Sequence, residues 1–322
     1  MIELVAHSAA MREAVRLAGR VAPTDANVLV TGESGAGKDA LALYIHRQSK
    51  RAAGSFVKID CAALPAELLE AELFGYERGA FTGAQESKPG RLEAAHKGTL
   101  VLDEIAHLST DAQAKLLRVI EQREFERLGG RRTVRVDARL VALTNVDLEE
   151  AVRRRAFRPD LFYRLNVVRI HVPPLRERHE DVRKLAQGFL RTYAAKHGRR
   201  VTKIEPDALK LLETYDFPGN VRELAHVLER AVIVADGEHV EVEHLPESVR
   251  AAVSLQKRRD ARRMTLAELE AAYIAETLMA ARGNKSEAAR LLGISRKNLY
   301  ERLARQKGND EAGTMNDELK RT

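Results

Sequence analysis

The chain has 322 residues, of which 44% are hydrophobic and 31% charged, and its net charge at neutral pH is +7. This composition excludes a disordered chain, and no apolar run approaches the roughly 18 residues that a membrane-spanning helix needs. The single cysteine, Cys61, excludes an intrachain disulfide and a metal site built from clustered cysteines. Because the N-terminus lacks the basic start and long apolar stretch of a secretory signal, we expect a cytoplasmic protein with no membrane partner.

The positive charge is concentrated near the C-terminus. Residues 251–307 contain 13 lysines and arginines against 6 aspartates and glutamates, and residues 308–322 contain 2 against 4, which leaves +2 on the first 250 residues. A strongly basic stretch beside a nearly neutral body favours a polyanionic partner such as DNA. On charge alone, an ordinary solvated helix surface remains an alternative.

The first half of the chain alternates short runs rich in β-branched residues with helical segments. Strands separated by helices indicate a parallel sheet covered on both faces, so we predict an α/β fold. A helix is expected over Asp111–Glu126 from the spacing of its apolar residues. The predicted strands are Asn27–Thr31, Phe56–Asp60, Thr99–Asp103, Arg139–Asn145 and Asn166–Val172.

Helices replace strands after Pro173. The third of them has a clear start signal, because Asn220 can cap it while Glu223 reaches back to the cap. The predicted helices are Asp181–His197, Pro206–Tyr215 and Asn220–Ala235. The expected organisation is an α/β subdomain (1–172), a helical subdomain (173–247), a polar linker (248–265), a small all-α domain (266–307) and a disordered tail (308–322).

A glycine-rich segment lies between the first strand and the next helical stretch. Its residues are Gly32, Glu33, Ser34, Gly35, Ala36, Gly37 and Lys38, followed by Asp39 where such loops usually carry serine or threonine. Strand–loop–helix is the context of a phosphate-binding loop, whose amides and helix N-terminus attract phosphate while the lysine reaches the outer phosphates. We predict that residues 32–39 bind the phosphates of a nucleotide. A glycine-rich turn that binds nothing is the alternative, and this context argues against it.

Two acidic residues end the third predicted strand. Ligands bind at the carboxyl ends of strands in open α/β sheets, so Asp103 is placed to hold Mg²⁺ directly or through water. Glu104 is placed to orient and deprotonate an attacking water molecule. A pair of surface acids would be the better interpretation in isolation. Together with the glycine-rich loop, the pair predicts nucleotide hydrolysis.

Several further motifs occur in chain order, and together with the glycine-rich loop they carry a resemblance. They are CAALP (61–65), GAFTGA (79–84), FRPDLFYRLNV (157–167), PPLRER (173–178), PGNVREL (218–224) and GNKSEAARLLGISRKNLYERL (283–303). With them the chain resembles the bacterial enhancer-binding proteins, the sigma-54-dependent transcription activators of the AAA+ ATPase superfamily. The fold implied is an AAA+ P-loop sheet with a helical lid subdomain and a Fis-type helix-turn-helix domain.

The resemblance implies roles for further residues. Thr144 and Asn145 would form the sensor I segment, Arg158 and Arg164 would be arginine fingers acting on the neighbouring subunit, and Arg222 would be sensor II on the lid. Such fingers imply a ring, which in this family is a hexamer and sometimes a heptamer. Either arginine could instead make a structural ion pair. The loop that engages sigma-54 RNA polymerase would be Gly79, Ala80, Phe81, Thr82, Gly83 and Ala84.

Asp60 departs from the family pattern, which usually has asparagine there. In the family that asparagine hydrogen-bonds the catalytic glutamate. If Asp60 faced Glu104, two carboxylates would repel or share a proton, and we would expect faster basal hydrolysis. A neutral pairing of Asp60 with a nearby basic side chain is the alternative.

The C-terminal domain indicates DNA binding by its own pattern. A first helix capped by Asn284 ends at Gly293, and a second, basic helix opens at Ser295, as in a helix-turn-helix. We expect dimerisation through Leu266–Met279 to coexist with binding of double-stranded DNA, and a helical dimerisation hairpin alone is the alternative. The expected base contacts are Arg296, Lys297 and Asn298, and the expected phosphate contacts are Arg302 and Arg305.

The function predicted is an ATP-hydrolysing activator that binds upstream DNA and remodels the sigma-54 RNA polymerase closed complex. A regulator of the same ancestry that does not depend on sigma-54 is the alternative, and the intact GAFTGA argues against it. The helix-turn-helix argues against an unrelated AAA+ motor.

Overall fold

The computed structural model describes residues 4–251, 270, 273–275, 277–278, 281, 283–300 and 302–303. The chain divides into two compact units, residues 1–250 and 251–322. Among the described residues, no helix is both long and apolar enough to cross a membrane.

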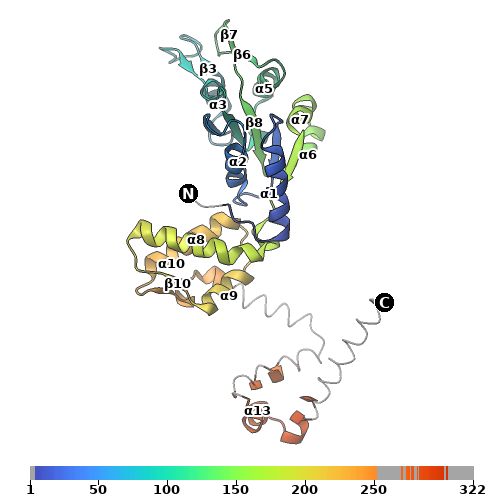
Figure 1. Ribbon diagram of the computed structural model, residues 1–322, viewed down its shortest axis with the longest axis vertical. Helices are drawn as coiled ribbons and strands as arrows, with labels where there is room; N and C mark the ends of the chain where they lie inside the picture. Colours follow the sequence, from blue (N-terminus) through green and yellow to red (C-terminus); the bar gives the residue numbers. More distant parts are fainter. Residues whose placement is uncertain are drawn as a thin grey trace, which may run out of the picture. The chain divides into compact units, whose positions relative to one another are not determined.

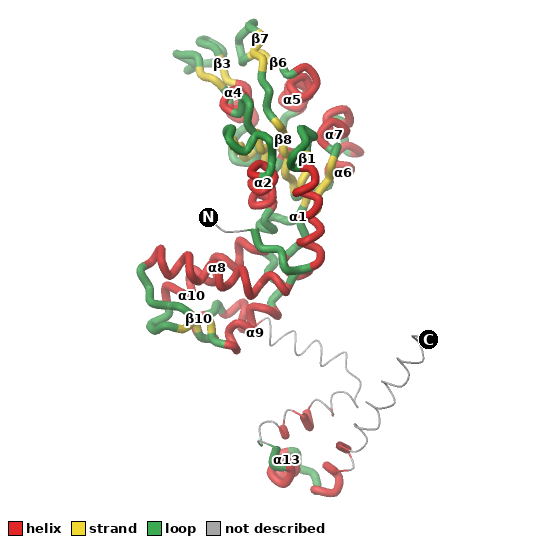
Figure 2. The backbone as a smooth tube through the Cα atoms, in the orientation of Figure 1, coloured by secondary structure: helices red, strands yellow, loops and turns green. Residues whose placement is uncertain are grey.

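The larger unit is built on a five-stranded parallel sheet (Figures 1 and 2). Its strand order is β2–β5–β8–β1–β9, with β2 and β9 at the edges. The strands are β1 (Val28–Thr31), β2 (Phe56–Asp60), β5 (Thr99–Asp103), β8 (Arg139–Thr144) and β9 (Val168–His171). The sequence analysis predicted all five to within two residues at each end. The segments that follow β1, β5 and β8 meet at one edge of the sheet, where ligands bind in this architecture.

Helices cover both faces of the sheet. Alternate strand residues point to opposite faces, so Leu100 and Leu102 belong to one buried cluster while Val101 belongs to the other. Helices α1 (Ala9–Val21) and α2 (Lys38–Arg47) pack on the Val101 face. The other face is covered by α3 (Ala66–Phe74), α4 (Arg91–Ala94), α5 (Thr110–Gln122), α6 (Leu148–Arg153) and α7 (Pro159–Leu165).

Two small hairpins project at the end of this unit remote from helices α8 to α10 (Figure 1). Strand β3 (Gly75–Tyr76) pairs with β4 (Lys88–Pro89), and β6 (Glu124–Glu126) pairs with β7 (Thr133–Arg135). The predicted helix over residues 111–126 was therefore too long at its C-terminal end. It stops at Gln122 because Arg123 takes the left-handed conformation (φ 57°) and pairs with Asp137.

A helical subdomain follows β9 and has its own buried cluster, which includes Phe189, Leu212 and Leu228. It contains η2 (Leu175–Glu177), α8 (His179–His197), α9 (Pro206–Thr214), α10 (Asn220–Val234) and η3 (Val242–His244). Two short strands that the sequence analysis did not predict, β10 (Lys203–Ile204) and β11 (His239–Val240), pair in parallel within it.

The sequence analysis predicted Asn220 as the cap of α10 with Glu223 reaching back to it, and the first of these two assignments was wrong. Gly219, and not Asn220, is the cap residue, and its amide donates to the Glu223 carboxylate at 2.7 Å. Asn220 itself is buried with a positive φ of 55°, and its side chain serves another purpose described below.

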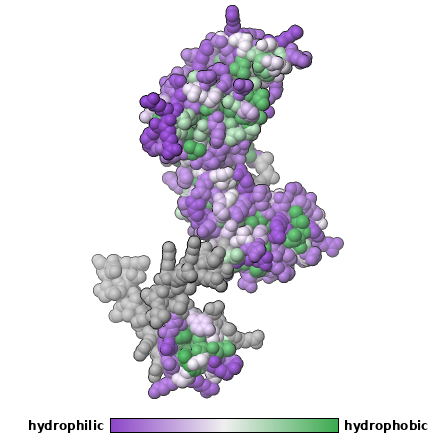
Figure 3. All heavy atoms as spheres, turned by 180° about the vertical axis from the view of Figure 1, so that it is seen from behind, coloured by the Kyte–Doolittle hydropathy of each residue, from purple (hydrophilic) through white to green (hydrophobic). Residues whose placement is uncertain are grey.

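The smaller unit contains α13 (Lys285–Leu291), which Asn284 caps by accepting the amides of Ser286 and Glu287, as predicted. A helical segment over residues 296–300 follows, and Ala288, Ala289 and Leu299 form a small core with Ile274. Leu291 and Tyr300 are about half exposed, and Figure 3 shows hydrophobic residues at the surface of this unit. Arg305, the tail 308–322, and most of the predicted linker and dimerisation stretch lie outside the described residues.

Candidate nucleotide site

The glycine-rich loop connects β1 directly to α2, which begins at Lys38. Gly35 and Gly37 have φ values of 73° and 107°, in the region that glycine adopts without strain. A side chain at Gly35 would also approach the carbonyl oxygen of Gly219 to 2.5 Å. The loop therefore needs glycine both for its own turn and for its close contact with the start of α10.

Lys38 is buried inside this loop. Its Nζ donates to the carbonyl oxygens of Gly32 at 2.8 Å and Glu33 at 3.2 Å, and it lies 3.9 Å from the Glu104 carboxylate. Burial lowers the pKa of Lys38, and the charges of Glu104 and Asp103 oppose that shift. A buried ammonium held by carbonyl oxygens of a helix-initiating loop is suited to exchange them for phosphate oxygens.

The predicted acid pair lies beside the loop. Asp103 is the last residue of β5, and Glu104 follows it in the left-handed conformation, with φ 51°. The Glu104 carboxylate accepts the amide of Asn145 at 3.3 Å, which links it to the end of β8. Asp103 accepts the amide of Glu104 at 3.1 Å. The structure thus brings together two strand ends that are 41 residues apart in the chain.

One basic residue at this edge was missed by the sequence analysis. Lys58, on the edge strand β2, places its Nζ 2.8 Å from Asp103 and 2.5 Å from Asp39. Burial lowers the pKa of Lys58, but hydrogen bonds to Asp103 and Asp39 outweigh it, and the net shift is upward. The available signal was a lysine in the middle of the otherwise apolar stretch FVKI.

The helical subdomain closes the site from the other side. A cavity of about 210 Å³ is lined by Lys38, Asp39, Asp103 and Glu104 on the sheet side. On the helical side Phe189, Val221 and Ala225 form an apolar wall beside Arg222. Arg222 donates to the Ser34 hydroxyl at 2.9 Å, and the amide of Val221 donates to the Gly35 carbonyl at 3.0 Å. The predicted residues that line this cavity are Ser34, Gly35, Gly37, Lys38, Asp39, Asp103, Glu104 and Arg222. Asn145 does not line it and is linked to it through its amide, which donates to Glu104.

A second set of contacts joins the loop to the helical subdomain through Glu33. Its carboxylate accepts two hydrogen bonds from Arg176, at 2.6 and 2.9 Å, and one from the Asn220 amide at 3.0 Å. These hydrogen bonds, Arg176 first, lower the pKa of Glu33 to about 2. Asn220 also accepts the amide of Leu175 at 2.7 Å. Arg176 and Asn220 belong to motifs noted in the sequence, but nothing there indicated that they meet Glu33.

Asp60 does not use its carboxylate towards Glu104 in this structure. It is exposed, and its Oδ1 accepts the amide of Ala62 at 2.9 Å. Cys61, by contrast, is buried, and burial together with the charges of Asp60, Asp103 and Glu104 raises its thiol pKa to about 12. An influence of Asp60 on hydrolysis stays a prediction.

The GAFTGA loop lies away from the cavity, between β3 and β4. Its ends are joined by the Gly79 amide, which donates to the Ala84 carbonyl at 2.8 Å. Phe81 is 42% exposed and packs edge-on against Tyr76. The base of the loop is joined to the segment after β6, because the Glu77 amide donates to the Leu128 carbonyl at 3.0 Å. An exposed aromatic tip on an anchored base is suited to contact another molecule.

The two predicted arginine fingers lie on the α7 side of the unit and do not line the cavity of their own chain. Arg158 pairs with Asp160 at 2.7 Å, and Arg164 pairs with Glu121 at 3.0 Å. The hydrogen bonds that Arg158 donates to Asp160 raise the pKa of Arg158. Both pairs are partly exposed, so each arginine can leave its carboxylate for a stronger anionic partner.

In the smaller unit the predicted DNA-contact residues differ in accessibility. Arg296 and Lys297 are exposed at the start of the second helical segment. Asn298 is half-buried and accepts the Arg302 guanidinium at 2.8 Å, and Arg302 also pairs with Glu270. In this structure Arg302 is therefore tied within its own domain.

Comparisons with known proteins agree with these features. The family described as the sigma-54 interaction domain matches residues 4–171, the AAA+ ATPase lid domain matches residues 176–262, and the bacterial regulatory protein, Fis family, matches residues 265–305. The chain is 44% identical over 307 residues to the regulatory protein AtoC of Escherichia coli (strain K12), covering 93% of this chain and 67% of that protein.

Two further likenesses span most of the chain. The transcriptional regulatory protein ZraR of Salmonella typhimurium is 44% identical over 302 residues, covering 94% of this chain and 68% of its own length. The crystal structure of NtrX from Brucella abortus in complex with ATP matches with a TM-score of 0.72 at 36% identity, covering 94% of this chain and 69% of that one.

Proposed function

The chain belongs to the sigma-54-dependent transcriptional regulators, with an AAA+ P-loop domain and a Fis-type helix-turn-helix, and from that premise we propose an ATP-driven activator. It would hydrolyse ATP, bind DNA upstream of promoters and use residues 79–84 to remodel the closed complex of sigma-54 RNA polymerase. The observation that carries the proposal is the single cavity that Lys38, Asp103, Glu104 and Arg222 share.

The residues around the cavity divide the chemistry between them. Lys38 would leave the carbonyl oxygens of Gly32 and Glu33 to bind the outer phosphates. Glu104 would orient the attacking water and accept its proton, with the Asn145 amide fixing the carboxylate. Arg222, already bound to Ser34 of the loop, would follow the nucleotide from the lid side.

The donor set also fits Mg²⁺. Asp103 offers a carboxylate at a strand end, and a cationic group, the Lys58 ammonium, already lies between it and Asp39. Carboxylate oxygens are the protein ligands that Mg²⁺ prefers. When bound, Mg²⁺ would neutralise the charge that develops on the phosphates. Asp103 would hold it.

Arg158 and Arg164 support a proposal of ring assembly. Since neither lines the cavity of its own chain, each would act on the cavity of a neighbouring subunit. The contact would be heterologous and close into a ring, in this family a hexamer. In the same way, Arg296, Lys297 and Asn298 are proposed to contact bases and Arg302 and Arg305 phosphates, with the domain acting as a dimer.

Reconstituted transcription tests this function. Purified sigma-54 RNA polymerase, a promoter with upstream DNA, ATP and the full chain should give open complexes. Thr82→Ala should keep ATPase activity and lose open-complex formation, because Thr82 is exposed in the loop and does not line the cavity. Thr202→Ala, at an exposed position of the lid, is the matched control and should activate normally.

Two results would contradict the proposal. Undiminished activation by Thr82→Ala would remove the assigned role of the loop. ATP hydrolysis by the full chain without any activation of sigma-54 transcription would instead favour the regulator that does not depend on sigma-54.

A further inference from the structure

Lys58 occupies an unusual position for a residue of an edge strand. Strand β2 pairs with β5 so that Asp60 lies opposite Asp103, and Lys58 lies opposite Val101. Lys58 shares a face of the strand with Phe56, which packs against the cluster beneath α1 and α2. From that face its side chain reaches the first turn of α2 and the end of β5 together. A single ammonium therefore joins the two elements that flank the phosphate-binding loop.

The ammonium lies between two carboxylates that have reason to repel each other. Its Nζ is 2.5 Å from Asp39 and 2.8 Å from Asp103. Like charges that share a site disfavour each other's ionised forms unless a cation lies between them. Among the described residues around the site, the carboxylates of Asp39, Asp103 and Glu104 are balanced by Lys38, Lys58 and Arg222. Without Lys58 the net charge of these six groups becomes negative, and the uncompensated charge lies near Asp103.

The contacts of Lys58 are also easy to exchange. Its side chain is 36% exposed and that of Asp39 is 55% exposed, so the pair is reachable by solvent and individually weak. Asp103 is more enclosed, at 16%. The ammonium is a compact charge on a flexible four-carbon stem, able to move aside while it stays near its partners. These are the properties of a counter-ion that can be displaced, and not of a permanent structural bridge.

We propose that Lys58 is a tethered counter-ion that holds the place of the divalent cation in the nucleotide-free protein and releases Asp103 when metal and nucleotide enter together. The inference deepens the proposed ATPase function and rests on it for the identity of the metal. It has two consequences. Free divalent cations should bind poorly without nucleotide, because they must displace Lys58. Nucleotide without metal should still bind measurably, because Lys58 supplies part of the missing positive charge.

The test replaces Lys58 by an uncharged side chain of similar length. Nucleotide-free wild-type protein and Lys58→Met are titrated with Mn²⁺, and free Mn²⁺ is followed by electron paramagnetic resonance. We expect Lys58→Met to bind Mn²⁺ about tenfold more tightly, the size of effect that a partly screened ammonium produces at a few ångströms. In a second measurement, a fluorescent ATP analogue is bound with excess EDTA and with excess Mg²⁺. The dissociation constant measured with EDTA, divided by the one measured with Mg²⁺, should rise about tenfold in Lys58→Met by the same argument.

Two variants control for effects other than charge at this place. Lys88→Met removes a second lysine, which lines a surface groove together with Lys58 but pairs with Glu72, and it should behave like the wild type in both measurements. Lys58→Arg keeps the charge and should keep Mn²⁺ binding weak. Thermal unfolding of each variant shows whether it is folded.

The outcomes separate the inference from the function on which it rests. Unchanged Mn²⁺ affinity and an unchanged EDTA-to-Mg²⁺ ratio in folded Lys58→Met would overturn the role of Lys58. Tight Mn²⁺ binding by Lys58→Arg would also overturn it, because charge would not be the cause. Failure of the wild type to bind the analogue even with Mg²⁺ would instead refute the proposed ATP site, and the Mn²⁺ titration would still decide about Lys58.

Discussion

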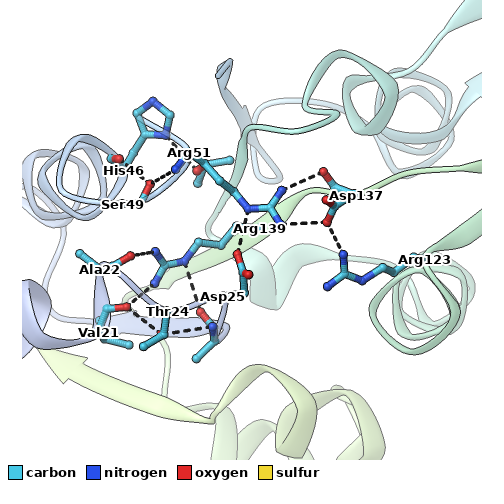
Figure 4. A network of polar contacts seen from close by, with 12 residues as sticks. Val21, Ala22, Thr24, Asp25, His46, Ser49, Arg51, Arg123, Asp137 and Arg139 are labelled. Atoms are coloured by element: carbon cyan, nitrogen blue, oxygen red, sulfur yellow. Dashed lines mark hydrogen bonds and ion pairs between the residues drawn. The ribbon is translucent and has the colours of Figure 1, made fainter. Parts of the chain in front are cut away.

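The strands of the central sheet begin along one side, its amino edge, and end along the opposite side, its carboxyl edge. Each of these two edges buries a basic side chain, and the partners of those side chains differ. At the carboxyl edge Lys38 donates to carbonyl oxygens of its own loop. At the amino edge Arg139, the first residue of β8, donates to carbonyl oxygens of Val21 at 3.0 Å, Ala22 at 2.5 Å and Ala26 at 3.3 Å (Figure 4). Those carbonyls lie at and just beyond the end of α1, where helices leave such groups without partners inside the helix.

The surroundings of the two side chains extend this difference. Beside Arg139, Arg51 is only 13% exposed and pairs with both Asp25 and Asp137, which closes the network (Figure 4). Beside Lys38 the chain leaves a cavity and three carboxylates, those of Asp39, Asp103 and Glu104, among the residues described there. A buried cation thus stabilises the fold where its acceptors belong to fixed elements, and it serves binding where its acceptors can be exchanged for a ligand.

The largest expected effect is on activity at the carboxyl edge. Lys38→Ala should abolish measurable nucleotide binding, because the loop would lose the ammonium that is proposed to bind the outer phosphates. Glu104→Gln should retain binding and lose hydrolysis by roughly 10²- to 10⁴-fold, the usual contribution of a general base. Equilibrium binding of a fluorescent analogue and steady-state ATPase rates check both. Normal turnover by Glu104→Gln would refute the assignment.

The next effect is on stability at the amino edge. Arg139→Met should lower the free energy of unfolding by about 3 kcal/mol, since the carbonyl oxygens of Ala22 and Ala26 lose the Arg139 donor, while that of Val21 still accepts from Thr24. Nucleotide affinity of the folded protein should not change. Chemical denaturation followed by circular dichroism measures the loss. Arg135→Met is the control, because that arginine is 87% exposed in a hairpin and should matter little. Equal stability of Arg139→Met and the wild type would break the contrast between the edges.

The sequence was most informative where local rules decide. Five strands and the glycine-rich loop follow from apolar runs and from residues that only certain turns accept, and Asp103 and Glu104 follow from the ends of strands. It was less informative where distant segments meet. Lys58 on β2 reaches Asp103 on the neighbouring strand β5, and Arg123 ends α5 in a conformation that its own sequence does not require. Neither outcome depends on a pattern within one segment.

Asn220 shows the same limit at a single residue. A capping residue and a residue that joins two subdomains look alike in sequence, because both need a short polar side chain. In the fold, Asn220 donates to Glu33 and accepts from Leu175, contacts that span 187 and 45 residues of chain. Because Asn220 makes these tertiary contacts, the cap position falls to Gly219, which the sequence alone did not indicate.

The smallest expected effect lies between the two subdomains, at Glu33, and it depends on pH. Glu33 is bound by Arg176 and Asn220, and its pKa is lowered to about 2 from an ordinary 4.5. A lowered pKa in the folded state contributes stability that is fully present above pH 4.5 and is lost as the pH falls towards 2. Because the Glu33 side chain is 42% exposed, Glu33→Gln should reduce the free energy of unfolding at pH 7 by no more than about 1 kcal/mol.

That small difference has a signature that separates it from a general loss of packing. Midpoints of thermal unfolding for wild type and Glu33→Gln should differ by a few degrees at pH 7 and converge as the pH is lowered through 4.5 towards 2, because the wild-type carboxylate then becomes protonated too. Glu86→Gln, at an exposed position in the same unit, should match the wild type throughout. A difference for Glu33→Gln that stayed undiminished as the pH fell to 2 would mean that the carboxylate charge is not what holds the loop to the lid. The loop would then be held to the lid by packing and by neutral hydrogen bonds such as the one from the Asn220 amide. The carboxyl edge would in that case differ more clearly from the amino edge, where charged arginines form the network.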